Sequence, residues 1–188
     1  MWRCRRCFKL TTGLAVPYQK CLICGGEMQI IPAGGEADSA QARAVRQDIQ
    51  LELDSFHFYK LARDQARHWE QRAVLERLYD AELKILHALE QKCHAHLEER
   101  VIELSLEEQN RLAQSLFRGI CLSEHSGVKD LYDAALGLEC HTRDQLRKLE
   151  AALPAGNEQK LCAELAAEED EHVALLEDEL RAMEGVAV

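Results

Sequence analysis

The chain has 188 residues, of which 47% are hydrophobic and three are proline, and its formal net charge is −10. This length allows one medium domain and a small module. The acidic balance argues against a nucleic-acid partner, since phosphate binding needs a clustered positive face. No apolar stretch approaches the roughly 20 residues that cross a membrane, and no hydrophobic segment follows the basic N-terminus as in a signal peptide. We therefore expect a cytoplasmic protein with no membrane partner.

The first 24 residues contain four of the eight cysteines, as two Cys-x-x-Cys pairs separated by thirteen residues. The pairs are formed by Cys4 with Cys7 and by Cys21 with Cys24. Two such pairs can present four thiolates tetrahedrally to one ion, which suits zinc or iron. A segment this short cannot bury enough apolar surface alone, so the metal would supply much of its folding free energy. The sequence therefore predicts a four-cysteine metal-binding domain over residues 1–34. A linker at residues 33–38 overlaps its end.

The remaining residues, 35–188, have apolar residues at helical spacing. Neither glycine nor proline occurs between Gly35 and Gly119. A turn is indicated at residues 153–157, where proline, glycine and asparagine come together, and Gly119 and Gly127 indicate a long crossover. The expected helices span about residues 39–66, 70–98, 106–117, 128–152 and 157–183. We expect an all-α, ferritin-like four-helix bundle with one long crossover, joined to the small N-terminal domain.

Four glutamates lie at the centres of apolar helical stripes. Glu52 and Glu82 are 30 residues apart, and so are Glu139 and Glu169. Antiparallel helices joined by a tight turn bring residues equidistant from that turn to one level. Burying a bare carboxylate is costly, so each needs a hydrogen-bonded partner in the core or a metal. His172 shares a helix face with Glu169, because residues three apart are neighbours. This arrangement predicts a di-iron carboxylate site.

Several motifs resemble the rubrerythrin family. The segment from Trp2 to Gly25 resembles its rubredoxin-like domain, with tryptophan before the first cysteine and Pro17 before the second pair. Residues 49–59 resemble its first bundle helix, where a tyrosine follows a glutamate by seven residues. Residues 165–172 resemble its fourth helix, where the ligands form Glu-x-x-His.

This resemblance implies a non-haem di-iron oxidoreductase that reduces hydrogen peroxide, with thiolate-bound iron passing on electrons from an external reductase. The implied roles are terminal ligation by Glu52 and Glu139, bridging by Glu82 and Glu169, capping of one iron by His172, and hydrogen-bond donation to a bridging carboxylate by Tyr59. The short linker makes an electron path within one chain long. Rubrerythrin-like proteins pair subunits so that one thiolate site faces another chain's di-iron site. We therefore expect a homodimer or larger.

Four positions depart from the family pattern. Phe8 stands where rubredoxins usually have glycine, so the four-cysteine site is open to zinc as well as iron. Ile85 stands where a histidine ligand would follow Glu82, and Leu146 and Thr142 replace a second tyrosine and a second glutamate. One metal position thus lacks its nitrogen donor, and two irons with water, one metal, or a mixed pair all fit. The alternative function is a metal-binding or sensing protein with a degraded bundle site and structural zinc. We expect the remaining histidines at or near the surface.

Overall fold

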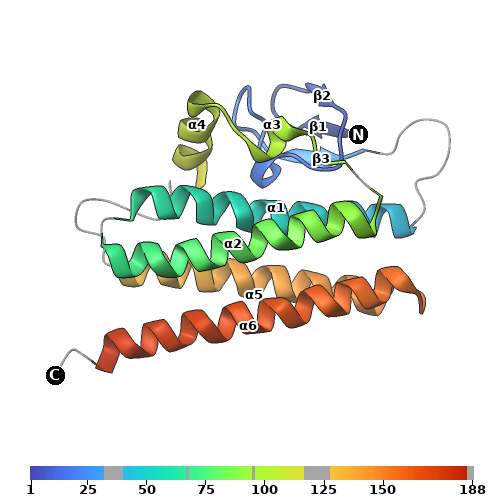
Figure 1. The fold of residues 1–188 in the computed structure, drawn as a ribbon. Helices are drawn as coiled ribbons and strands as arrows, with labels where there is room; N and C mark the ends of the chain where they lie inside the picture. The colour runs from blue at the N-terminus through green and yellow to red at the C-terminus, as the bar shows by residue number, and fades with distance from the viewer. Residues whose placement is uncertain (32–39, 67, 95, 117–127, 186–188) are drawn as a thin grey trace. The chain divides into compact units, whose positions relative to one another are not determined.

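The computed structural model describes residues 1–31, 40–66, 68–94, 96–116 and 128–185. These residues are mostly helical, with a three-stranded sheet near the N-terminus (Figure 1). They divide into two compact units, Met1–Leu116 and Phe117–Val188. The predicted linker, the boundary between residues 34 and 35, and the glycines of the predicted crossover lie outside the described residues. Within the described ranges, no helix has both the length and the apolar content needed to cross a membrane.

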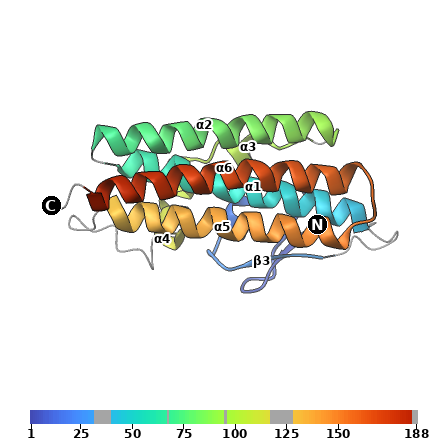
Figure 2. The ribbon, with the colours of Figure 1, turned by 90° about the horizontal axis from the view of Figure 1, so that it is seen from below.

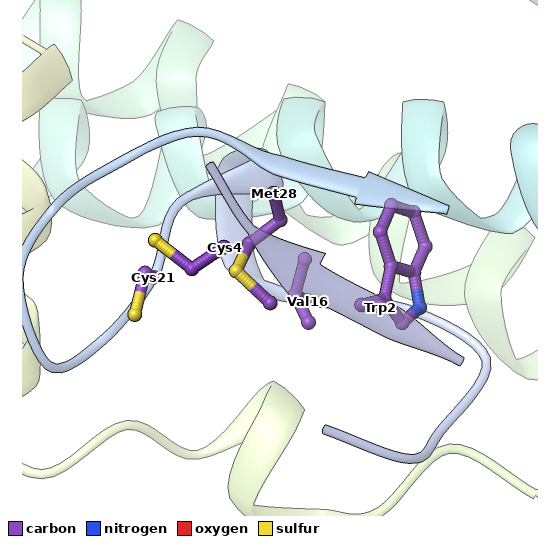
Figure 3. Packing of buried hydrophobic residues seen from close by; sticks show 5 residues of the cluster. All are labelled: Trp2, Cys4, Val16, Cys21 and Met28. Carbon is purple, nitrogen blue, oxygen red and sulfur yellow. The ribbon is translucent and has the colours of Figure 1, made fainter. Parts of the chain in front are cut away.

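The N-terminal sheet has the strand order β2-β1-β3, and both pairings are antiparallel. The central strand β1 (Trp2–Cys4) lies between β2 (Leu10–Thr11) and β3 (Met28–Ile30). A short turn, η1 (Pro17–Gln19), lies between β2 and β3 in the chain. Figure 3 shows the small apolar cluster beneath this sheet. Its members are Trp2, Cys4, Val16, Cys21 and Met28.

The first unit also contains a helical hairpin, in which α1 (Ala40–Gln65) packs against α2 (Trp69–Lys92). The prediction for α1 is confirmed within one residue at each end. Helix α2 ends at Lys92, earlier than predicted, because His94 adopts a left-handed backbone with φ of 46°. The amide of Leu97 then donates to the Glu90 carboxylate at 2.7 Å, so the chain leaves the helix and buries Leu97.

Two shorter helices follow in this unit. The four-residue α3 (Glu99–Ile102) is not anticipated by the sequence analysis, whereas α4 (Leu106–Leu116) is. Helix α4 begins with a capping box, since the amides of Ser105 and Glu108 bond to each other's side chains at 3.0 and 3.3 Å. Both helices contact α1.

The second unit is a hairpin of α5 (Val128–Ala152) and α6 (Asn157–Gly185). The two helices lie side by side along their length in both views (Figures 1 and 2). The first and last residues of α5 and α6 agree with those of the predicted helices to within two residues. The predicted turn at residues 153–157 lies between the two helices. The four-helix ferritin-like arrangement of the two hairpins stays a prediction.

Candidate metal centres

The four cysteines of the N-terminal segment come together as predicted. One sulfur from each lies within 4.8 Å of the others, with 3.5 Å between Cys4 and Cys24 and 3.7 Å between Cys7 and Cys21. A disulfide would require about 2.05 Å. Sulfurs bound tetrahedrally to one ion at about 2.3 Å lie about 3.8 Å apart. The cluster therefore fits one tetrahedral metal ion.

Both cysteine pairs form the same tight turn. The amide of Phe8 donates to the carbonyl of Cys4 at 3.1 Å, and the amide of Gly25 donates to that of Cys21 at 2.7 Å. Phe8 and Gly25 both have left-handed backbones, with φ of 59° and 68°. Glycine adopts this conformation at no steric cost, whereas another residue pays about 1–2 kcal/mol. Phe8 thus keeps the turn that glycine makes elsewhere, and its side chain is 70% exposed.

Backbone amides favour the thiolate form of Cys4. The amides of Cys7 and Arg6 each lie 3.4 Å from Cys4 Sγ. The Cys7 amide lowers the pKa of Cys4 most, and the amide of Arg6 adds to it against the opposing effect of burial, so that the pKa falls to about 6. Gly26, which the sequence analysis did not single out, allows close packing here. A Cβ at this position would lie 2.6 Å from Arg6 Cβ and 3.0 Å from Cys4 Sγ.

A second donor group lies in the α5–α6 hairpin. Glu139 of α5 and Glu169 and His172 of α6 place one donor atom each within 4.8 Å of one another. His172 Nδ1 is 3.8 Å from Glu139 Oε2 and 3.6 Å from Glu169 Oε2. Hydrogen bonds are shorter than this, whereas donors that share one ion at about 2.1 Å lie roughly 3.4 Å apart. Both glutamates are fully buried and His172 is 9% exposed, so this set fits a metal ion.

Buried polar side chains lie near this group on α5. Thr142, one turn after Glu139, is 1% exposed, and its hydroxyl has no hydrogen-bond partner among the described residues. Tyr132, two turns before Glu139, is also buried, and burial, with a smaller contribution from Glu179, raises the pKa of its hydroxyl to about 12. Tyr132 is therefore neutral at physiological pH.

The α1–α2 hairpin holds the other two predicted carboxylates. Glu52 lies on α1 and Glu82 on α2, and both are fully buried, as is Tyr59. Ile85, three residues after Glu82, is 8% exposed, so α2 offers no nitrogen donor at that position. Terminal ligation by Glu52, bridging by Glu82 and the role of Tyr59 stay predictions.

The other histidines differ in their surroundings. His87 and His141 are exposed, as expected. His57 is fully buried, contrary to the expectation that it lies at or near the surface. Its Nε2 is 2.6 Å from the carbonyl oxygen of Val101 in α3, and burial lowers its pKa to about 4. His57 is about 140° around α1 from Glu52, so it does not replace the nitrogen donor missing at Ile85.

Comparison of the chain with family models, with curated proteins and with solved structures finds no match.

Proposed function

We propose that the protein is a rubrerythrin-like non-haem iron oxidoreductase that reduces hydrogen peroxide. The observation that supports it best is the buried group of Glu139, Glu169 and His172, in a chain that also brings four cysteine sulfurs together. Carboxylate and imidazole donors suit redox-active iron, and four thiolates suit an iron that carries one electron at a time. The proposed reaction uses both kinds of site.

In this proposal the two hairpins form a four-helix bundle of the ferritin type, in which Glu52 and Glu82 join the α5–α6 donors. Glu52, Glu82, Glu139, Glu169 and His172 would hold the metal, with Glu82 and Glu169 shared between two positions and His172 supplying the nitrogen donor of one. The position beside Ile85 would have no nitrogen donor from the chain and would take water or bind weakly.

Iron bound at the carboxylate site would supply the two electrons that break the O–O bond of peroxide. The protons come from the carboxylate groups or from Tyr59, so that each peroxide gives two waters. The buried glutamates hold the donors in place, and His172 is the member of its group with the most solvent access. Iron held by the four cysteines would return electrons one at a time from an external reductase.

A second candidate is a metal-binding or sensing protein with structural zinc at the cysteines. Ile85 favours this candidate because it leaves one metal position without a nitrogen donor. Phe8 also favours it, since a strained non-glycine residue in the first turn departs from the usual electron-transfer pattern.

Elemental analysis of protein purified without added metal separates the two candidates. The proposed function predicts about three irons per chain, a thiolate-to-iron absorption band, and consumption of peroxide when a reductant is supplied. Zinc with little iron, and no peroxide consumption after anaerobic loading with iron, would establish the second candidate instead.

We also propose that the chain assembles as a homodimer or larger. Light scattering at the working concentration tests this. A monomer that still turns over with an external donor would rule it out.

A further inference from the structure

The side-chain amide of Gln50 on α1 is hydrogen-bonded to the cysteine module (residues 1–31) of its own chain. The amide N–H of Val16 donates to Gln50 Oε1 at 2.9 Å, and Gln50 Nε2 donates to the carbonyl oxygen of Val16 at 2.5 Å. Gln50 is 1% exposed. Because the side chain pairs with both polar groups of one residue, it fixes the position and the orientation of the module on the helix.

Further hydrogen bonds surround the contact between Gln50 and Val16. Gln50 Nε2 also lies 2.6 Å from Asp54 Oδ1, one turn further along α1. Asp54 is 8% exposed, and Gln19 bonds to it from η1. Gln19 and its neighbour Tyr18 have left-handed backbones, with φ of 46° and 45°. Strained non-glycine residues persist only where their surroundings hold them, so η1 is shaped to fit this side of α1.

One end of the contact lies beside the four cysteines, and the other lies on the helix of Glu52, which is a metal ligand only in the proposed function. On one side, Val16 packs in the same buried cluster as Cys4 and Cys21 (Figure 3). On the other, Gln50 and Glu52 are two residues apart on α1, so they point to opposite sides of the helix. Connected groups therefore lead from the cysteines through the Val16 peptide and the Gln50 amide, across one helix about 10 Å thick, to Glu52.

We propose that this contact is the electron route from the four-cysteine site to the carboxylate site of the same chain, with Gln50 as its positioning residue. The inference rests on the proposed function. With iron bound at both sites, one electron would pass from ferrous iron at the cysteines, which would become ferric, to ferric iron at the carboxylate site, which would become ferrous. No proton moves and no bond breaks. A low-potential flavoprotein or iron–sulfur protein then restores the electron at the cysteines.

This route differs from the expectation that subunit pairing brings the two sites together. The short linker suggested a long path, but the path depends on where the module docks, and it docks on α1. Two experiments distinguish the routes.

The first experiment combines two defective chains. Cys4→Ser with Cys7→Ser removes the electron source, and Glu169→Gln with His172→Ala removes the peroxide site. The two chains are co-expressed with different tags and purified on both, so that only mixed assemblies remain. We expect donor-dependent peroxide reduction to stay at the level of the single defective chains. Recovery of a substantial part of the wild-type rate would show transfer between subunits, and failure to recover any mixed assembly would exclude a stable subunit-pairing route.

The second experiment replaces the amide. Gln50→Met keeps the length of the side chain and removes its hydrogen bonds. Gln47→Met is the control, because Gln47 lies one turn earlier on α1, also beside the module. The fully reduced, iron-loaded proteins are mixed with peroxide, and oxidation of the cysteine-bound iron is followed by its visible band. We expect Gln50→Met to slow this oxidation at least roughly tenfold, since transfer depends on the geometry that the amide fixes, while Gln47→Met changes it little.

Two further readouts separate a lost route from a damaged site. The spectrum and the potential of the cysteine-bound iron should be unchanged in Gln50→Met, and in the zinc-loaded protein the Val16 amide should exchange its hydrogen faster than in the wild type. A wild-type oxidation rate in Gln50→Met despite faster exchange at Val16 would overturn the proposed route. If peroxide fails to oxidise the cysteine-bound iron of the wild type, the proposed function fails and the route fails with it, while the exchange result still reports the contact.

Discussion

The two helical hairpins place their glutamates at equivalent positions but surround them differently. Glu139 and Glu169 follow Glu52 and Glu82 by 87 residues each, and all four are fully buried. At the same offset, Ile85 of α2 corresponds to His172 of α6. The α5–α6 hairpin therefore has a nitrogen donor beside its carboxylates, and the α1–α2 hairpin has an apolar side chain there.

The hairpins also differ at a second pair of corresponding positions. Buried His57 on α1 corresponds to Asp144 on α5, whose side chain is 54% exposed. Helix α1 is covered by the cysteine module and by α3, whereas Asp144 of α5 faces solvent. Equal spacing of carboxylates thus does not mean equal roles. In the proposed function α5–α6 holds the better metal donors, and α1–α2 connects the metal to its electron source.

The largest expected effect tests whether the hairpins are independent of the module. Changing Cys4 and Cys7 to serine should abolish metal binding at the cysteines, because two thiolates cannot replace four, and should unfold the module. Since α1 meets the module with polar groups such as Gln50 and Asp54, we expect most of the helical circular dichroism to remain. Loss of the helical signal together with the thiolate band would show that the module and the hairpins are not separable.

The next effect tests the donor set of α5–α6. His172→Ala should weaken metal binding at the carboxylate site by roughly 100-fold or more, since even outer partners of metal ligands contribute ten- to hundred-fold. Competition with a chelator measures this affinity. The control is His141→Ala, because His141 is an exposed histidine on α5 and should leave the affinity unchanged. Equal affinities in the two variants would exclude His172 as a ligand.

Ile85→His makes the first hairpin resemble the second. A histidine three residues after Glu82 lies on the same helix face, and neutral imidazole is a good iron ligand. We expect metal occupancy beside α2 to rise, with affinity increased about tenfold, and peroxide turnover to become faster. Ile85→Asn, which is polar but a weaker donor, is the control. A gain in both variants would attribute the effect to water access, and a gain in neither would show that the two hairpins do not share one site.

The smallest effect concerns the cysteine module that packs on α1. Phe8→Gly should stabilise the metal-loaded module by about 1 kcal/mol, because it relieves a left-handed non-glycine residue. Gly25→Ala should destabilise it by a similar amount, since no atom lies within 4 Å of the added Cβ and only its φ of 68° opposes the change. Chelator-induced unfolding measures both. Equal stability of Phe8→Gly and the wild type would show that the exposed Phe8 side chain stabilises the turn by other contacts.

Local patterns in the sequence predict the structure of this chain correctly. Helix bounds on α1, α5 and α6 follow from apolar periodicity, and the cysteine pairs and Glu-x-x-His follow from spacing along the chain. The expectation for one face of α1, that His57 lies at or near the surface, is wrong. Gln50, Asp54 and His57 are all buried there, because the module and α3 cover them. Periodicity reports the polarity of a helix face, and what covers that face depends on residues far along the chain.

The hydrogen bonds between Gln50 and Val16 also affect the order in which the chain folds. Val16 and Gln50 are 34 residues apart, and His57 and Val101 are 44 apart, whereas α5 and α6 are joined by a short turn. Contacts between distant residues form more slowly than local ones. On a ribosome the module can bind its metal first, but its docking must wait for α1, and α1 is enclosed only after α3 has been made. The α5–α6 hairpin, although synthesised after the module and α1, needs no such wait. The region proposed to transfer electrons is therefore the part of the protein most exposed to incomplete assembly.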